Sequence, residues 1–137
     1  MVRPEVVRKR LNRLDEYLAI LKNMQSVSYD EFSQNPEKYG SVERFLHLAV
    51  EAVTDIGNHI IAEENLGMVN SYSDIPGILK DKGVIDEALC QTWIRMIGFR
   101  NALVHDYVEI DFEIVYDVLQ NHIQDLESIK KVFSAYL

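Results

Sequence analysis

Arg100 and His105 are the two residues whose types and spacing most clearly suit catalysis. The arginine guanidinium is a permanent cation that can fork onto two oxygens of a phosphate group. The histidine imidazole titrates near neutral pH, so it can accept and donate protons. In the cleavage of a phosphodiester, His105 would move protons to or from the ribose 2′-hydroxyl and the leaving oxygen, while Arg100 would stabilise the developing charge. This chemistry requires no metal ion.

Arg100 is also the clearest local inconsistency in the helical pattern around it. At 100° per residue it falls about 20° from Leu89, within an apolar stripe that includes Trp93 and Met96. A charge in such a place is costly unless it is paired with an anion or opened to a ligand. The pattern leaves two interpretations open: a structural ion pair with a core carboxylate, and a functional site.

The spacing of Arg100 and His105 limits how they can share a site. On an unbroken helix, positions five apart point about 140° away from each other. Either the helix ends near Val104 and the chain brings His105 back, or each residue completes a site with a second subunit. The spacing alone does not choose between these arrangements.

Amphipathic helices are expected to position these residues. Only 6 Gly and 3 Pro occur in 137 residues, and alternating β-branched runs are scarce, which favours helices over a sheet. The expected helices cover residues 4–24, 41–67, 75–80, 86–104 and 111–133, with a polar connection at 26–40 in which Asp30 caps a short turn. We therefore predict an all-α fold, an up-and-down bundle of about five helices that forms a single domain, residues 1–137.

Apolar residues at spacings of three and four mark the buried faces of the first and last helices. In the first helix they are Val7, Leu11, Leu14, Leu18 and Leu21. In the last they are Val115, Val118, Leu119, Leu126, Ile129 and Phe133, with His122 in the same stripe. His122 is therefore expected to lie in the core or at a subunit seam.

Charge is unevenly distributed along the chain. The net charge of −8 argues against broad binding to a nucleic-acid backbone, and surplus acidity would suit a basic partner protein. Yet five of the 14 basic residues fall within the first 13 positions: Arg3, Arg8, Lys9, Arg10 and Arg13. They form either a solvated helix face or a local patch that contacts phosphate.

Cysteine content and hydropathy indicate a cytoplasmic protein. The single cysteine, Cys90, cannot form an internal disulfide and is expected to be a small core residue. No apolar run approaches the roughly 18 residues needed to span a bilayer, and the N-terminus lacks the apolar stretch of a signal peptide. We expect no membrane association.

The second long helix carries a polar face, with Glu51, Asp55 and Asn58 on it. Solvated surface is the default interpretation, and the alternative is that Asp55 orients the arginine or histidine of the site. His47 and His59 have no partners at the spacing of metal ligands, so no metal site is expected.

The stretch RNALVHDY, residues 100–107, resembles the R-x(4)-H-x-Y signature of HepT toxins, which belong to the HEPN superfamily of helical ribonucleases. An Asn after the Arg, here Asn101, is typical of these toxins. The long helix that includes residues 49–61 is similar to the family's second helix. The resemblance extends over most of the chain, with the same size and helix order.

The resemblance implies a HEPN-like homodimer whose active site lies in a cleft between the subunits. It assigns catalysis on RNA to Arg100 and His105, without a metal or other cofactor, and makes the chain the toxin of a bacterial toxin–antitoxin pair. It also implies a partner antitoxin, a nucleotidyltransferase of the MNT type, which transfers AMP onto Tyr107. We count two supporting residues, Asn101 and Asp106, since Asp106 adjoins His105 and could influence its pKa.

Two alternatives to a ribonuclease remain. The chain could be a non-catalytic helical dimer that docks a nucleotidyltransferase as its accessory subunit. It could also be a plain helical adaptor in which Arg100 is only a structural ion pair.

Overall fold

The computed structural model describes residues 2–105 and 111–137, with the backbone alone at positions 104 and 105. Within these ranges the chain contains helices and no strand, which confirms the all-α prediction. The helices are α1 (Pro4–Met24), α2 (Tyr29–Gln34), α3 (Pro36–Glu63), α4 (Asp74–Asp81), α5 (Glu87–His105), α6 (Phe112–Asn121) and α7 (Ile123–Phe133), followed by a 3₁₀ turn at Ser134–Tyr136. None of the helices in this part of the chain is both long and apolar enough to cross a membrane.

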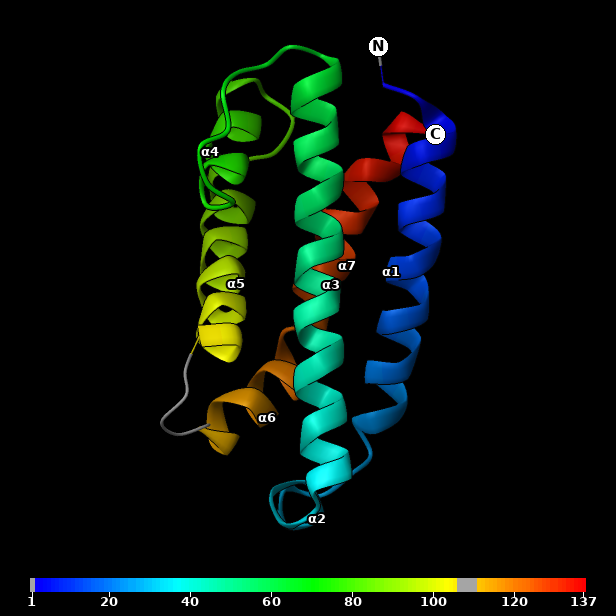
Figure 1. Cartoon of the computed structure of the whole chain (residues 1–137), viewed down its shortest axis with the longest axis vertical. Helices are drawn as coiled ribbons and strands as arrows, with labels where there is room; N and C mark the ends of the chain where they lie inside the picture. The colour runs from blue at the N-terminus through cyan, green and yellow to red at the C-terminus, as the bar shows by residue number, and fades with distance from the viewer. Residues whose placement is uncertain (1, 106–110) are drawn as a thin grey trace.

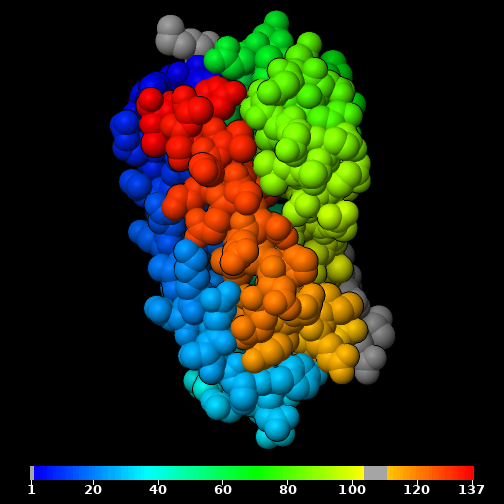
Figure 2. Space-filling view, turned by 180° about the vertical axis from the view of Figure 1, so that it is seen from behind, coloured from blue at the N-terminus to red at the C-terminus, as the bar shows by residue number. Residues whose placement is uncertain are grey.

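The long helices form an up-and-down bundle around α3. Helices α1, α3 and α5 run side by side in alternating directions, with α3 in the middle (Figure 1). Helix α7 packs behind these three and contacts each of them. From behind, α6 and α7 cover the bundle between α1 and α5 (Figure 2). Among the described residues, no helix covers the opposite face of α3, between α1 and α5 (Figure 1).

The apolar stripes supply the core, as the sequence predicts. One cluster of buried side chains in the described ranges draws on every α-helix named above. Every apolar residue expected on the buried faces of the first and last helices is buried. Fully burying a Leu, Ile or Phe side chain stabilises the fold by roughly 1.5–3 kcal/mol, so this cluster is the main force that holds the helices together.

The contact between α3 and α5 fixes the position of the candidate site. Trp93 of α5 is fully buried, and its Nε1 donates a hydrogen bond to Oγ1 of Thr54 on α3 at 3.2 Å. Gly57 allows this approach, because a Cβ there would lie 2.8 Å from Cγ2 of Ile75 and 3.0 Å from the Trp93 ring. The register set by Trp93 places Arg100, two turns further along α5, beside α3.

Two boundaries of α3 differ from the prediction, and both ends are set by asparagines. The helix begins at Pro36 rather than Ser41, since the Asn35 side chain accepts from the backbone N–H of Glu37 at 3.0 Å and proline suits the first helical position. It ends at Glu63 rather than Gly67. Asn65 takes the left-handed conformation (φ 53°) that terminates many helices, a position more often filled by glycine.

The expected last helix is divided in two at His122. This residue leaves the helical conformation (φ −121°, ψ 4°), so α6 ends before it and α7 begins after it. Its side chain is 43% exposed, and its Nδ1 lies 2.9 Å from Oδ2 of Asp125. The prediction of a core position for His122 is therefore wrong, because the break turns the imidazole out of the apolar stripe.

Candidate functional site

Arg100 lies at the uncovered face of the bundle, where α5 meets α3. Its Nη2 donates a hydrogen bond to Oε2 of Glu51 at 3.1 Å, and its Nη1 donates to Oδ1 of Asn101 at 3.1 Å. The side chain of Arg100 is 18% exposed and that of Glu51 is 35% exposed. An ion pair thus exists, but its carboxylate is half-exposed on α3 rather than in the core.

One donor of Arg100 is left unsatisfied. Its Nε is buried and finds no hydrogen-bond partner within residues 2–105 and 111–137. A buried donor without a partner costs about 1–3 kcal/mol, and such groups in folded proteins call for an explanation. The oxygen of an anionic ligand would satisfy this donor.

His47, one helical turn before Glu51, shares the same carboxylate oxygen. Its Nε2 lies 2.8 Å from Oε2 of Glu51. Burial lowers the pKa of His47 below its usual value; Glu51 acts in the opposite direction, and Arg100 and Arg44 add to the lowering. The imidazole is therefore neutral at neutral pH, and its Nε2 carries the proton donated to Glu51.

Tyr72, in the connection between α3 and α4, covers the other flank of Arg100. The guanidinium carbon lies 5.7 Å from the centre of the Tyr72 ring, within range of a cation–π interaction. The Tyr72 hydroxyl donates to Oδ1 of Asp55 at 2.6 Å, which together with burial raises the pKa of Tyr72 to about 12. Asp55 is connected to the arginine through Tyr72, whereas Glu51 contacts it directly.

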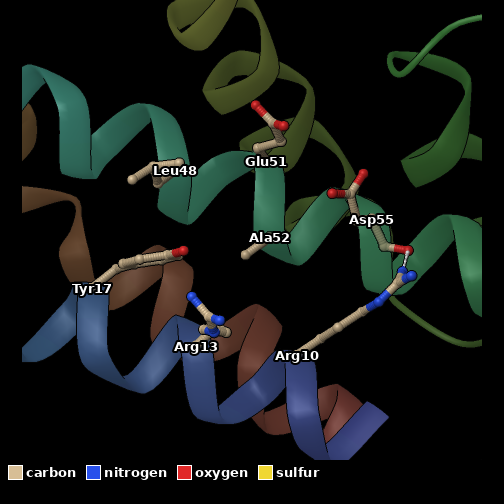
Figure 3. Close-up of a pocket in the computed structure, with 7 residues that line it drawn as sticks. All are labelled: Arg10, Arg13, Tyr17, Leu48, Glu51, Ala52 and Asp55. Atoms are coloured by element: carbon tan, nitrogen blue, oxygen red, sulfur yellow. Dashed lines mark hydrogen bonds between the residues drawn. The ribbon is translucent and has the colours of Figure 1, made fainter. Parts of the chain in front are cut away.

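A cavity of about 240 Å³ opens on the α1 side of α3 (Figure 3). It is lined by Arg10, Arg13, Tyr17, Leu48, Glu51, Ala52 and Asp55. Arg10 and Arg13 extend from α1 toward α3, and Nη1 of Arg10 donates to the backbone carbonyl of Asp55 at 3.1 Å. Glu51 and Asp55 therefore belong both to this cavity and to the cluster around Arg100.

The other motif residues are only partly placed. Helix α5 ends at His105, so the backbone of His105 belongs to the same helix as Arg100. The side chain of His105, and all of Asp106 and Tyr107, lie outside the described residues. How His105 reaches Arg100 thus stays a prediction. In the part of the chain that is described, no group of three or more His, Cys, Asp or Glu side chains could hold a metal ion.

Sequence reasoning missed three members of the cluster. Glu51 was expected to be solvated surface, and neither His47 nor Tyr72 was expected near the arginine. The four-residue spacing of His47 and Glu51 puts them on one helix face and was the one available signal. Tyr72 lies in a loop, where no periodicity indicates what it contacts.

The fold and the motif together define a class: small helical bundles with an arginine, and a histidine five residues later, at the end of one helix. The chain belongs to the ribonuclease HepT-like family, which matches residues 14–133. The resemblance given by the motif is thereby confirmed.

Two relatives have names that state an activity on RNA. The chain is 33% identical over 127 residues to the mRNA nuclease HepT of Shewanella oneidensis, covering 91% of this chain and 96% of the relative. It is 26% identical over 138 residues to the tRNA nuclease HepT of Aphanizomenon flos-aquae, covering 99% and 92%.

Solved structures of toxin–antitoxin complexes share the fold. One complex with AMP-PNP contains a chain that matches with a TM-score of 0.88 and 27% identity, over 96% of this chain and 98% of that one. The tri-AMPylated HEPN toxin of Shewanella oneidensis, solved in complex with its MNT antitoxin, matches with a TM-score of 0.88 and 28% identity over 95% and 97%.

Proposed function

We propose that this chain is the ribonuclease toxin of a bacterial toxin–antitoxin pair, with Arg100 and His105 as its catalytic residues. Membership of the ribonuclease HepT-like family supports the activity. The assignment to Arg100 depends on one observation. Glu51 and Asn101 hold its guanidinium in place, yet its buried Nε has no hydrogen-bond partner among the described residues.

The contacts of Arg100 suit the binding of a scissile phosphate. Glu51 and Asn101 each use one of its five N–H groups, which leaves Nε and one hydrogen on each terminal nitrogen. These donors can bind the non-bridging oxygens as negative charge develops there. His105 takes the proton from the ribose 2′-hydroxyl and protonates the leaving oxygen, so the RNA itself supplies the nucleophile and no metal is needed.

A homodimer brings the two catalytic residues into one cleft in this proposal. Residues five apart on one helix diverge by about 140°, so a single protomer does not readily direct both toward one phosphate. The partner of the dimer is an MNT nucleotidyltransferase antitoxin, as in the neighbouring toxin structure.

The antitoxin inactivates the toxin by transferring AMP from ATP to the hydroxyl of Tyr107, with release of pyrophosphate. The tyrosine proton is lost, and a phosphodiester to adenosine is gained. The new phosphate lies two residues from His105 and competes with RNA for the Arg100 site.

Growth inhibition tests the catalytic assignment. Expression without the antitoxin is expected to stop growth, and Arg100→Ala and His105→Ala are each expected to abolish this effect. Arg95→Ala is the matched control, because Arg95 is an exposed arginine of the same helix whose only described hydrogen bond is to Thr92. Circular dichroism checks that each variant folds. Toxicity that survives both catalytic substitutions would contradict the proposal.

Mass spectrometry tests the modification. Incubation with the partner transferase and Mg-ATP is expected to add units of about 329 Da, the mass of one transferred AMP residue. Tyr107→Phe is expected to remain unmodified. An adduct of the same mass on Tyr107→Phe would show that another residue is the acceptor.

A further inference from the structure

Arg13 presents an unpaired positive charge in the cavity between α1 and α3. Its side chain extends from α1 toward α3 (Figure 3). Among residues 2–105 and 111–137 it has no hydrogen bond or ion pair, whereas the neighbouring Arg10 is anchored on the Asp55 carbonyl. The cavity therefore holds one fixed guanidinium and one that is free to bind an anion.

The two carboxylates of the cavity are already engaged elsewhere. Glu51 accepts from Arg100 and from His47, and in Figure 3 its carboxylate points toward α5 rather than into the cavity. Oδ1 of Asp55 accepts from Tyr72. Neither carboxylate is paired with Arg13. Because Arg100 neutralises Glu51, the two arginines of the cavity face only the single charge of Asp55, a local excess of positive charge in a chain whose net charge is −8.

The cavity lies close to Arg100, because only α3 separates them. Glu51 and Asp55 line the cavity and contact the Arg100 cluster, so the distance between the two places is on the order of one helix diameter, ~10 Å. An extended strand bound at Arg100 would therefore pass this cavity with its next nucleotides. Tyr17, Leu48 and Ala52 give it an aromatic and apolar wall against which a base or ribose can pack.

We propose that this cavity is a second phosphate-binding subsite for single-stranded RNA, in which Arg13 contacts a phosphate that flanks the scissile one and Arg10 forms the adjacent wall. The proposal rests on the ribonuclease function proposed above. The subsite also explains how a protein with a net negative charge binds RNA, because the arginines contact phosphate within one cavity rather than over the whole surface.

A protein partner is the competing occupant of this basic surface. RNA is favoured because the cavity is concave, contains a free guanidinium and adjoins the motif arginine. A docked protein would be expected to depend on a wider, flatter surface. Measurements of RNA binding and of antitoxin binding by Arg13→Ala separate the two occupants.

Binding of a non-cleavable 2′-O-methyl RNA, followed by fluorescence anisotropy over a range of salt concentrations, tests the subsite. Arg13→Ala is expected to weaken binding about tenfold, the loss of one charge-assisted contact. The slope of log K against log salt should fall by about 0.7, the contribution of one phosphate contact in a single strand. In cleavage assays the same variant should raise KM and leave kcat unchanged, because the contact is to a flanking phosphate.

Arg8→Ala is the matched control. Arg8 is also an exposed arginine of α1 without a described partner, but it lies about 160° around the helix from Arg10 and does not line the cavity. This variant removes the same charge from the same helix and is expected to bind RNA like the wild type. Equal losses in Arg8→Ala and Arg13→Ala would overturn the subsite, since they would indicate a general effect of charge.

The outcomes also separate the subsite from the function on which it rests. If the wild type cleaves RNA and Arg13→Ala binds it with unchanged affinity and salt slope, the subsite is wrong and the ribonuclease function stands. If the wild type neither binds nor cleaves RNA, both are wrong. If Arg13→Ala weakens binding of the antitoxin and not of RNA, the surface belongs to the protein partner.

Discussion

The ion pair between Arg100 and Glu51 should be measurable as a coupling between two substitutions. We expect Arg100→Ala and Glu51→Ala to be less destabilising together than the sum of their separate effects. The difference is the pairwise interaction, which a double-mutant cycle isolates.

Its magnitude follows from the geometry. A hydrogen bond between charged groups contributes roughly 1.5–3 kcal/mol when it is shielded from water. Here the bond is 3.1 Å long and Arg100 is 18% exposed, but Glu51 is 35% exposed. Since solvent screening weakens exposed pairs, we expect a coupling free energy of about 1 kcal/mol.

Urea denaturation of the wild type, both single variants and the double variant measures this coupling. The control is the same cycle on Lys38 and Glu31, which lie 3.0 Å apart with 34% and 61% of their side chains exposed. That pair should give about 0.3 kcal/mol. If the two cycles give the same coupling, the view that Glu51 holds Arg100 in place is refuted.

Two further predictions concern packing and pH. Gly57→Ala should reduce the free energy of unfolding by about 1–3 kcal/mol, since its methyl group would lie within 3 Å of a buried side chain. The control is Gly40→Ala, whose methyl group would meet nothing within 4 Å and which should be neutral or stabilise α3 by up to ~1 kcal/mol. Equal shifts of the melting temperature in the two variants would contradict this prediction. Burial lowers the pKa of His47 in the fold, so the folded state favours the neutral imidazole. The free energy of unfolding should therefore be highest above about pH 6.5 and should decline as the pH falls below that value, because the unfolded chain then binds a proton more readily than the folded one. The loss of stability between about pH 7 and about pH 5, followed by the urea midpoint, should be smaller in His47→Gln but should remain in part, because burial also lowers the pKa of His59. An unchanged decline in His47→Gln would count against the burial of that imidazole.

The helices and their buried faces could be predicted because they depend on local periodicity. The apolar residues of α1 from Val7 to Leu21 recur at spacings of three and four over about four turns, and all of them are buried. The helices expected at 86–104 and 111–133 also begin close to the predicted positions, where Asp86 and Asp111 each accept a hydrogen bond from the backbone of the helix that follows.

The helix ends and the break at His122 depend on features that the pattern does not contain. Asn35 and Asn65 do what serine and glycine were expected to do a few residues further along. No proline or glycine marks the break at His122. It is set by tertiary packing, in which Ile123 at the start of α7 is buried while the imidazole is turned outward.

For the site, the sequence indicated the unusual residue but not its surroundings. Arg100 was identified because a charge interrupts an apolar stripe. Its partner could not be identified, because the contact with Glu51 joins two helices whose register is set elsewhere, by Trp93 and Gly57. The contact with Tyr72 depends on the path of a loop.

Cleavage of total RNA by the purified protein in the presence of EDTA is the decisive experiment for the proposed metal-independent ribonuclease activity. We expect the wild type and Arg95→Ala to degrade RNA at the same rate, and Arg100→Ala and His105→Ala each to be slower by about 100-fold or more. Absence of cleavage by the wild type, or an Arg100→Ala protein that cleaves as fast as the wild type, would contradict it.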